Sequence, residues 1–360
     1  MIQALPSRTQ LSELLSSLSS VRIAVVGDFA VDTYWYADMT QSELSRETVL
    51  PTRPVVRECY TPGAAANVAW NLADLGVKSI YAVTIVGQDW RWKIMHSLLR
   101  DIGVDVEHVL ESEDWATTMY AKPVLMAHGL EREDARLDFL SDHPLAYELE
   151  ERFLAEVRSV LPKVDVVTLS DQVTPGIFTN RGIAALAALA EKHPEVTFVA
   201  DSRHRISAFR HMVIKPNSLE AARALFPHQI PKEITQSEIA DAAPRLYDVI
   251  GRPVYVTLGE QGVLICNEGE VRHIPGVPLL PPIDVVGAGD TFLATLAASL
   301  AAGTDCWEAG ALANLAAAIV CKKLNQTGTA PPDEIWTLYD TLLHQDIRAS
   351  ATQDRKKCDD

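Results

Sequence analysis

Several sequence features that identify common protein classes are scarce or absent in this chain of 360 residues. Its five cysteines are odd in number and include no Cys-x-x-Cys pair, which argues against a disulfide framework and against a structural zinc site. The chain also has no His-Glu-x-x-His sequence and no Gly-Lys dipeptide. Zinc proteases of that type and proteins with a Walker A phosphate loop are therefore excluded.

Long apolar runs and excess positive charge are missing as well. No apolar stretch approaches the ~20 residues that a membrane helix requires. The leucines around Glu13 indicate a short amphipathic helix rather than the apolar centre of a secretory signal, so we expect a cytoplasmic protein without a membrane partner. A net charge of −16 disfavours nucleic acid, and any bound phosphate must be held by local donors or by a divalent cation.

The pattern of apolar segments indicates an α/β fold. Val21–Val26 is a run of buried-strand type that ends in Gly27 and Asp28, and from Tyr147 onward apolar strands alternate with helices. Strands separated in this way form parallel sheets with helices on both faces. We predict a helical extension over residues 1–20, one α/β domain over 21–345, and a charged tail over 346–360.

The segment from Asp284 to Asp290 is the first candidate for chemistry. Gly287, Ala288 and Gly289 allow backbone N–H groups to converge at the start of a helix, whose positive end attracts an anion. Asp290 then has the position of a base for an attacking hydroxyl. The alternative is an ordinary helix start in which Asp290 is the N-cap residue.

Two further turns follow predicted strands. Thr257, Gly259 and Gly262 make a tight turn at the carboxyl edge of the sheet, where ligands bind in open α/β folds; a plain hairpin turn is the alternative. Asn217 and Glu220 open the next helix, where their spacing by itself indicates a capping box without any ligand, and only their position between the other motifs favours a binding role.

Small and polar residues near the first strand form another group. Gly63 and Asn67 enter a helix through residues small enough for a ligand to approach the backbone, and the Asn67 amide can bind sugar hydroxyls. Asp28 and Asp32 follow the first strand, and each is otherwise an ordinary loop carboxylate.

These motifs, in this order over residues 20–340, resemble the ribokinase/PfkB family of carbohydrate kinases. The resemblance implies a three-layer αβα sandwich with a mostly parallel central sheet and a small β-strand lid, here at about 33–60 and 117–140. It implies an ATP-dependent transfer of a phosphoryl group to a sugar hydroxyl, with Mg²⁺ and in some members K⁺.

The resemblance also gives each motif a role. Asp290 is the catalytic base and the 287–289 amides stabilise the transferred group. Asp28, more clearly than Asp32, contacts the acceptor together with Gly63 and Asn67. The resemblance assigns nucleotide binding to Asn217, Thr257, Gly259, Gly262 and Asn314. It assigns Glu220 to Mg²⁺, which this residue holds through water. A monovalent cation is assigned to Asp284 and to the loop near 325–329.

Within the family, the likeness is greatest to the heptose-phosphate kinases of ADP-heptose synthesis, seen in Asp28, Asp32, Tyr34-Trp35-Tyr36 and Arg136-Leu-Asp-Phe139. The segment 169–176 departs from them, because it lacks a lysine that could hold the substrate's phosphate; Arg136, Lys122 or Arg203 could substitute. A nucleoside kinase and a non-catalytic sugar sensor remain as alternatives. Exposed lid strands favour a homodimer.

Overall fold

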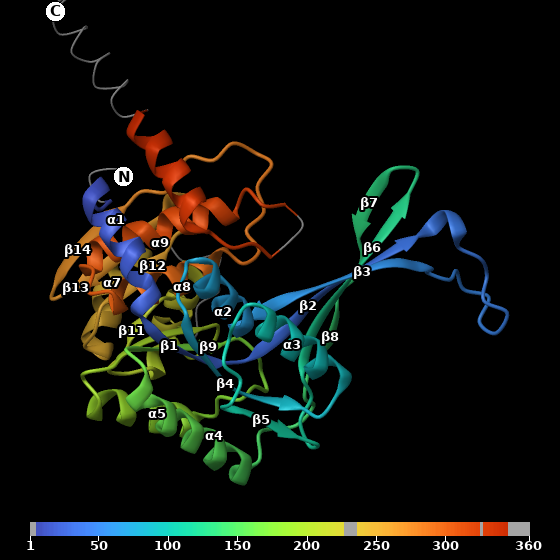
Figure 1. The fold of residues 1–360 in the computed structure, drawn as a ribbon, viewed down its shortest axis with the longest axis horizontal. Helices are drawn as coiled ribbons and strands as arrows, with labels where there is room; N and C mark the ends of the chain where they lie inside the picture. Colours follow the sequence, from blue (N-terminus) through green and yellow to red (C-terminus); the bar gives the residue numbers. More distant parts are fainter. Residues whose placement is uncertain (1–4, 227–235, 325–326, 345–360) are drawn as a thin grey trace, which may run out of the picture.

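The computed structural model describes residues 5–226, 236–324 and 327–344, so the tail predicted at 346–360 lies outside the described residues. Helices cover both faces of a mostly parallel sheet, and a second, smaller sheet projects to one side (Figure 1). This is the α/β sandwich with a β-strand lid that the sequence predicts, and the fold class is confirmed.

The central sheet has nine strands in the order β14-β13-β12-β11-β10-β9-β1-β4-β5. Every neighbouring pair from β12 to β5 is parallel, whereas β13 and β14 pair antiparallel at one edge. Its strands are β1 (Arg22–Gly27), β4 (Ser79–Gly87), β5 (Val109–Ser112), β9 (Val166–Asp171), β10 (Thr197–Ser202), β11 (Val213–Ile214), β12 (Val254–Thr257), β13 (Val263–Asn267) and β14 (Glu270–Ile274).

The strands of the parallel part are apolar on both faces because helices cover both. In β1, Ile23 and Val25 pack on one side while Ala24 and Val26 pack on the other. One face carries α1 (Arg8–Ser17), α2 (Ala65–Asp74), α3 (Trp90–Asp101), α8 (Ala288–Ala301) and α9 (Cys306–Val320). The other carries α4 (Tyr147–Val160), α5 (Asn180–Lys192), α6 (Ser218–Leu225) and α7 (Gln236–Ile250).

The segment predicted as an N-terminal extension packs on this framework. Leu11 and Leu14 of α1 are buried in the same core as α8 and α9. Residues 332–344 are also helical, and the hydroxyl of Tyr339 donates to the carbonyl of Pro6 at 2.9 Å. The first helix therefore shares the hydrophobic core of the large domain. No helix within the described ranges is both long and apolar enough to span a membrane.

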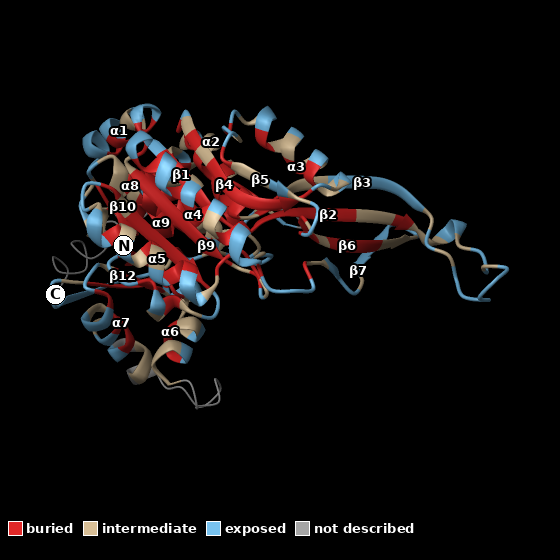
Figure 2. Ribbon diagram, turned by 90° about the horizontal axis from the view of Figure 1, so that it is seen from below, coloured by how far each residue is buried: buried red, intermediate tan, exposed pale blue. Residues whose placement is uncertain are grey.

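The lid is a five-stranded sheet in the order β3-β2-β6-β7, with β8 also paired to β6. It consists of β2 (Phe29–Asp38), β3 (Val55–Ala64), β6 (Thr118–Ala127), β7 (Leu130–Glu133) and β8 (Leu137–Phe139). The half of β2 nearest the body is buried, and burial declines along the strand toward the lid's outer end (Figure 2). In β3 as well, the residues at the outer end are exposed and those next to the body are buried or half-buried.

Candidate active site

The start of α8 forms the centre of the site. Gly287 is the residue that precedes the helix and has φ 78°, a left-handed conformation that favours glycine. A Cβ atom there would lie 3.1 Å from Nδ2 of Asn67, so the position is also crowded. Asp290 lies within the first helical turn, which means that the alternative in which it is the N-cap residue is wrong.

The N–H of Ala288 donates to the carbonyl of Val285 at 3.2 Å, so it is not the free amide expected from sequence. Among the described residues, no such bond occupies the N–H groups of Gly287 and Gly289. The first turn gives α8 a positive end.

Asp290 is held in place from α2. Nδ2 of Asn67 donates to Oδ2 of Asp290 at 2.9 Å. Burial raises the pKa of Asp290 to about 7, and the negative charges of Asp201 and Asp32 add to this rise. The hydrogen bond from Asn67 and the positive charge of Lys215 act in the opposite direction. A carboxyl with a pKa near neutrality is suited to accept a proton under ordinary conditions.

A buried polar network fixes the orientation of the Asn67 amide. Nδ2 of Asn71 donates to Oδ1 of Asn67 at 3.2 Å and to its backbone carbonyl at 2.9 Å. The hydroxyl of Thr291 in turn donates to Oδ1 of Asn71 at 2.7 Å. Because Oδ1 of Asn67 accepts in this network, its Nδ2 faces Asp290. Asn67 therefore orients the carboxyl of Asp290, a contact that is absent from the sequence prediction.

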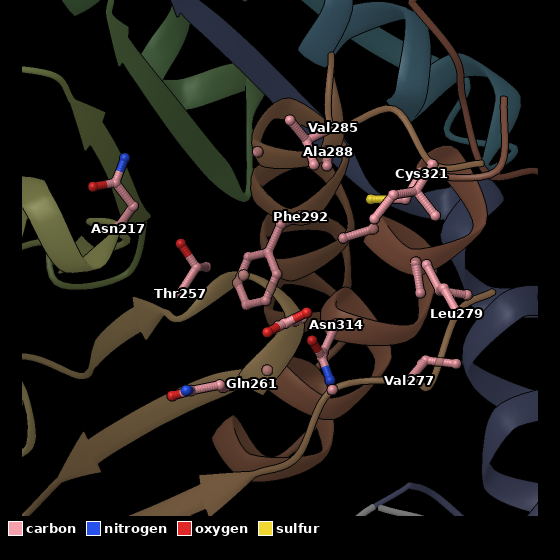
Figure 3. A pocket seen from close by; sticks show the side chains of 18 of the residues that line it. Asn217, Thr257, Gln261, Val277, Leu279, Val285, Ala288, Phe292, Asn314 and Cys321 are labelled. Carbon is pink, nitrogen blue, oxygen red and sulfur yellow. The ribbon is translucent and has the colours of Figure 1, made fainter. Parts of the chain in front are cut away.

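A cavity of about 700 Å³ opens beside α8. Figure 3 shows Phe292 between the polar side chains of Asn217 and Thr257 and the apolar group that includes Leu279 and Val277. The cavity is lined by Lys215, Asn217, Ser218, Thr257, Gly259, Glu260, Gln261, Gly262, Gly276, Val277, Pro278, Leu279, Ile283, Val285, Ala288, Gly289, Phe292, Asn314, Ala317, Ala318 and Cys321. One polar end and one apolar end match a ligand with phosphates and a flat ring.

The turn after β12 shapes one wall of this cavity. Gly262 has φ 96°, and a Cβ atom on it would lie 2.1 Å from the carbonyl oxygen of Ile274, so this position requires glycine. Thr257 pairs with Asn217 in an isolated bridge and brings the two loops together. Asn314 of α9 also lines the cavity, and its Nδ2 donates to the carbonyl of Pro275 at 3.0 Å.

Buried charges gather at the polar end. Nζ of Lys215 lies 3.2 Å from Oδ2 of Asp201, and both side chains are buried. Glu220 and Asn217 form a complete capping box, with bonds of 2.8 and 2.9 Å. Burial, and then the charge of Asp201, raises the pKa of Glu220, while Lys215 opposes the rise. The carboxyl groups of Asp201 and Glu220 thus outnumber the single ammonium of Lys215 at this end of the cavity.

A residue of the lid, Asp32 of β2, acts electrostatically on Asp290. Asp32 is buried and accepts a 3.0 Å hydrogen bond from the hydroxyl of Thr327. A Cβ atom on Gly63 would lie 2.8 Å from Cγ of Asp32, so the absence of a side chain there leaves room for the carboxylate. Burial raises the pKa of Asp32. Asp32 and Asp290 thus lie close enough to affect each other's charge.

Asp28 has a different environment from the one expected. Its Oδ2 accepts from the backbone N–H groups of Gln172 and Val173, and its Oδ1 accepts from that of Ile177, each at 3.0 Å. Burial nonetheless raises the pKa of Asp28 to about 6. These three bonds tie Asp28 to the loop after β9, whereas Asp32 accepts only the bond from Thr327 among the side-chain hydrogen bonds of the described residues.

Two other predicted residues already have partners. Arg136 makes a bidentate contact with Asp138 at 2.6 and 2.8 Å. Oδ1 of Asp284 accepts from the N–H of Val286 at 3.0 Å, and its own N–H donates to Cys321. Of the predicted cation loop, residues 325 and 326 lie outside the described part of the chain.

Three residues of the site, Asp201, Lys215 and Asn71, have no role in the sequence prediction, and Thr327 is expected there only within the cation loop near 325–329. Lys215 directly precedes Pro216-Asn217, and Asn71 lies one helical turn after Asn67, so spacing offered a signal for both. Nothing local marks Asp201 or the contact of Thr327 with Asp32, because both depend on tertiary contacts.

Known proteins are similar to this chain over most of its length. The family described as pfkB family carbohydrate kinase matches residues 22–333. The bifunctional protein HldE of Trichlorobacter lovleyi is 30% identical over 343 residues, which are 94% of this chain and 67% of that protein. HldE of Desulfatibacillum aliphaticivorans is 29% identical over 323 residues, or 89% of this chain and 63% of that protein. The chain therefore spans less than two thirds of the length of this second relative.

Solved structures share the fold at low sequence identity. Escherichia coli phosphofructokinase-2 in complex with potassium has a TM-score of 0.72 and 20% identity, covering 89% of this chain and 99% of that one. Arabidopsis thaliana ribokinase complexed with ribose and ATP has a TM-score of 0.65 and 20% identity, covering 89% and 98%.

Proposed function

Because this chain belongs to the pfkB family of carbohydrate kinases, we propose that it transfers the γ-phosphoryl group of ATP to a hydroxyl of a sugar or sugar phosphate. The observation that carries this proposal is the position of Asp290. Ala288 and Gly289 line the cavity on one side, and the charge of Asp32 acts on Asp290 from the other. The carboxyl of Asp290 thus follows directly after two cavity-lining residues and lies within electrostatic range of Asp32.

The chemistry follows from the groups around α8. The acceptor oxygen attacks the γ-phosphorus, its proton passes to the carboxylate of Asp290, and ADP leaves with the electrons of the broken bond. The N–H groups of Gly287 and Gly289 stabilise the negative charge on the transferred group, because they are fixed before reaction. The N–H of Ala288 already donates to the carbonyl of Val285 and helps to fix the turn. Nζ of Lys215, near Gly289 and paired with Asp201, adds positive charge on the same side.

The nucleotide fits the cavity with its phosphates toward Lys215, Asn217 and Thr257 and its base toward the apolar end near Asn314. Within the described residues, no group of three or more metal-binding side chains occurs. In this proposal an Mg²⁺ ion arrives with the phosphates and is held through water by Glu220, as Mg²⁺ usually keeps several waters. When bound, Mg²⁺ neutralises charge on the phosphate oxygens.

A monovalent cation is part of the proposal. Asp284 orders the start of the loop before α8, next to Cys321 at the end of α9. A K⁺ ion bound there would order the backbone amides of the anion site. We expect turnover to rise when KCl replaces NaCl at equal ionic strength, and equal rates in the two salts would remove K⁺ from the mechanism.

The favoured acceptor is a heptose phosphate or a similar sugar phosphate, since the HldE proteins are among the relatives at 29–32% identity. The test is a screen with ATP and Mg²⁺ over heptose, fructose and ribose phosphates, the free sugars, and adenosine. Turnover of a sugar or sugar phosphate supports the proposal. Turnover of adenosine alone would identify a nucleoside kinase, and sugar binding without turnover would identify a sensor.

A homodimer through the lids completes the proposal. The strands β3 and β7 are the edges of the lid sheet, and Val55, Val56, Leu130 and Leu137 are exposed on it. Exposed strand edges with apolar side chains pair readily with a second copy. Light scattering should give about twice the chain mass for the native protein and the chain mass for Val56→Lys. A monomeric native protein would refute the dimer alone.

A further inference from the structure

Three positively charged side chains from separate parts of the chain, Lys122, Arg136 and Arg203, act on Asp32. We call the surroundings of Asp32 the acceptor side of the site, because the resemblance to carbohydrate kinases implies that Asp32 contacts the acceptor. In the lid register, Asp32 pairs with Tyr120 and Tyr34 pairs with Lys122. Since alternate residues of a strand share one face, these four side chains lie on the same face of the lid sheet. Arg203, which follows β10, acts electrostatically on Asp32 and on Tyr120.

Lys122 is buried yet has few partners. Only 8% of its surface is exposed, and its Nζ donates to the hydroxyl of Tyr34 at 3.1 Å. No carboxylate among the described residues lies within 4.0 Å of it. Burial acts to lower the pKa of Lys122, but Tyr34, Asp32 and Glu133 outweigh that effect and the pKa is raised. Lys122 is therefore a charged ammonium with three N–H donors, and its hydrogen bond to the hydroxyl of Tyr34 uses one of them.

Arg203 has donors available as well. Its Nε donates to Oε1 of Gln172 at 2.7 Å, and within the described ranges it forms no ion pair. Arg136 differs, because Asp138 already balances its charge. The guanidinium of Arg136 also stacks over the ring of Tyr120, 4.4 Å from the ring centroid. Two cations with open donors thus remain on the acceptor side, Lys122 and Arg203.

We infer that Lys122 and Arg203 bind a phosphate monoester on the acceptor, at the end away from the hydroxyl that Asp290 activates; this rests on the proposed kinase function. An ammonium and a guanidinium fork together match a tetrahedral dianion in charge and in hydrogen-bond geometry. Asp32 remains for the sugar hydroxyls. A protein of net charge −16 repels anions in general, so an anionic acceptor needs such local cations.

The inference accounts for a difference in sequence. The segment 169–176 lacks the lysine expected beside the acceptor, and the structure uses this segment to hold Asp28. Gln172 of the same segment instead accepts from Arg203 and orients its guanidinium. Arg203, which follows β10, and Lys122 of the lid thus supply two cations that both act on Asp32.

The test compares a sugar phosphate with the same sugar lacking the phosphate, in Lys122→Met, Arg203→Gln and the double variant. Each single change should raise KM for the phosphorylated acceptor by about 30-fold, the usual effect of one hydrogen bond to a charged group. KM for ATP and for the free sugar should stay within about twofold. Lys78→Gln, an exposed residue at the amino end of β4, is the control and should leave all constants unchanged.

Inorganic phosphate is the second probe. It should compete with the phosphorylated acceptor in the native protein and lose this effect in the double variant. Lys122→Arg, which keeps the charge, should retain most of the native KM, and Arg203→Gln tests the exposed partner even if Lys122→Met fails to fold. Equal KM effects on both acceptors, or none on either, would overturn the inference.

Calorimetry separates this inference from the kinase proposal. Binding of the sugar phosphate to the protein without ATP does not require turnover. If no acceptor is phosphorylated but the sugar phosphate binds and Lys122→Met weakens it, the kinase proposal fails and the anion site stands. If turnover is normal and binding is insensitive to both residues, the anion site fails and the kinase proposal stands.

Discussion

Replacing Asp290 by asparagine should remove catalysis and at the same time stabilise the fold. Asparagine keeps the size of the side chain and an oxygen that accepts from Nδ2 of Asn67, so the 2.9 Å contact survives. It cannot take the acceptor's proton. We expect kcat to fall by at least about 100-fold, the typical contribution of a general base, with KM for ATP within about twofold.

The stability change follows from the pKa of the same carboxyl. Its ordinary value is 3.8 and its value in the fold is about 7. Below pH 3.8 the group is protonated in both states; as the pH rises toward 7, only the unfolded state gains from ionisation, so the folded protein progressively loses stability. About three pKa units correspond to about 4 kcal/mol as an upper limit. Asp290 keeps partial solvent access, so we expect about half of this, about 2 kcal/mol.

The assay is thermal unfolding of the native protein and of Asp290→Asn without nucleotide at pH 8 and pH 5. For a chain of this length, about 2 kcal/mol should raise Tm by about 3 °C at pH 8, and the gain at pH 5 should be less than half as large. Asp305→Asn is the control, because this exposed N-cap residue of α9 can be replaced by an equally good cap. A stable variant with near-native turnover, or a Tm gain that does not depend on pH, would contradict the reasoning.

Three further changes test other parts of the site. Gly63→Ala places a Cβ atom 2.8 Å from Cγ of Asp32, so KM for the acceptor should rise about tenfold while KM for ATP stays constant in steady-state assays. Asn71→Ala leaves the hydroxyl of Thr291 buried without its acceptor, and urea unfolding should detect a loss of about 1–3 kcal/mol. Gly262→Ala forces a Cβ atom to 2.1 Å from a carbonyl oxygen, so nucleotide binding measured by calorimetry should weaken at least about tenfold; unchanged affinity would show that the loop is not part of the nucleotide site.

Much of the site could be predicted because its motifs are local. The turn before α8 requires small residues and a left-handed glycine, and the turn at Gly262 requires a residue without a side chain, so sequence alone indicates both. The capping pair Asn217 and Glu220 is equally local. Such features depend on residues within a few positions of one another, where spacing determines geometry.

The two carboxylates after β1 illustrate the limit of this reasoning. Asp28 and Asp32 are four residues apart and both follow an apolar strand, so the sequence does not separate their roles. The structure does so through residues more than 140 positions away: the loop after β9 donates three backbone hydrogen bonds to Asp28, whereas Thr327 contacts Asp32. Local spacing carries no information about such distant donors.

By itself, the sequence determined the α/β class and the small-residue turn that precedes the carboxylate at 290, since apolar periodicity and glycine placement act over short distances along the chain. The lid came from the resemblance to the kinase family. Only the tertiary structure decided which side chains meet at that carboxylate. Asn67 orients Asp290, Asp201 pairs with Lys215, and Lys122 is buried in the lid beside Tyr34. These contacts join separate elements, and burial changes the pKa of Asp290 and Lys122 only once the elements have packed together.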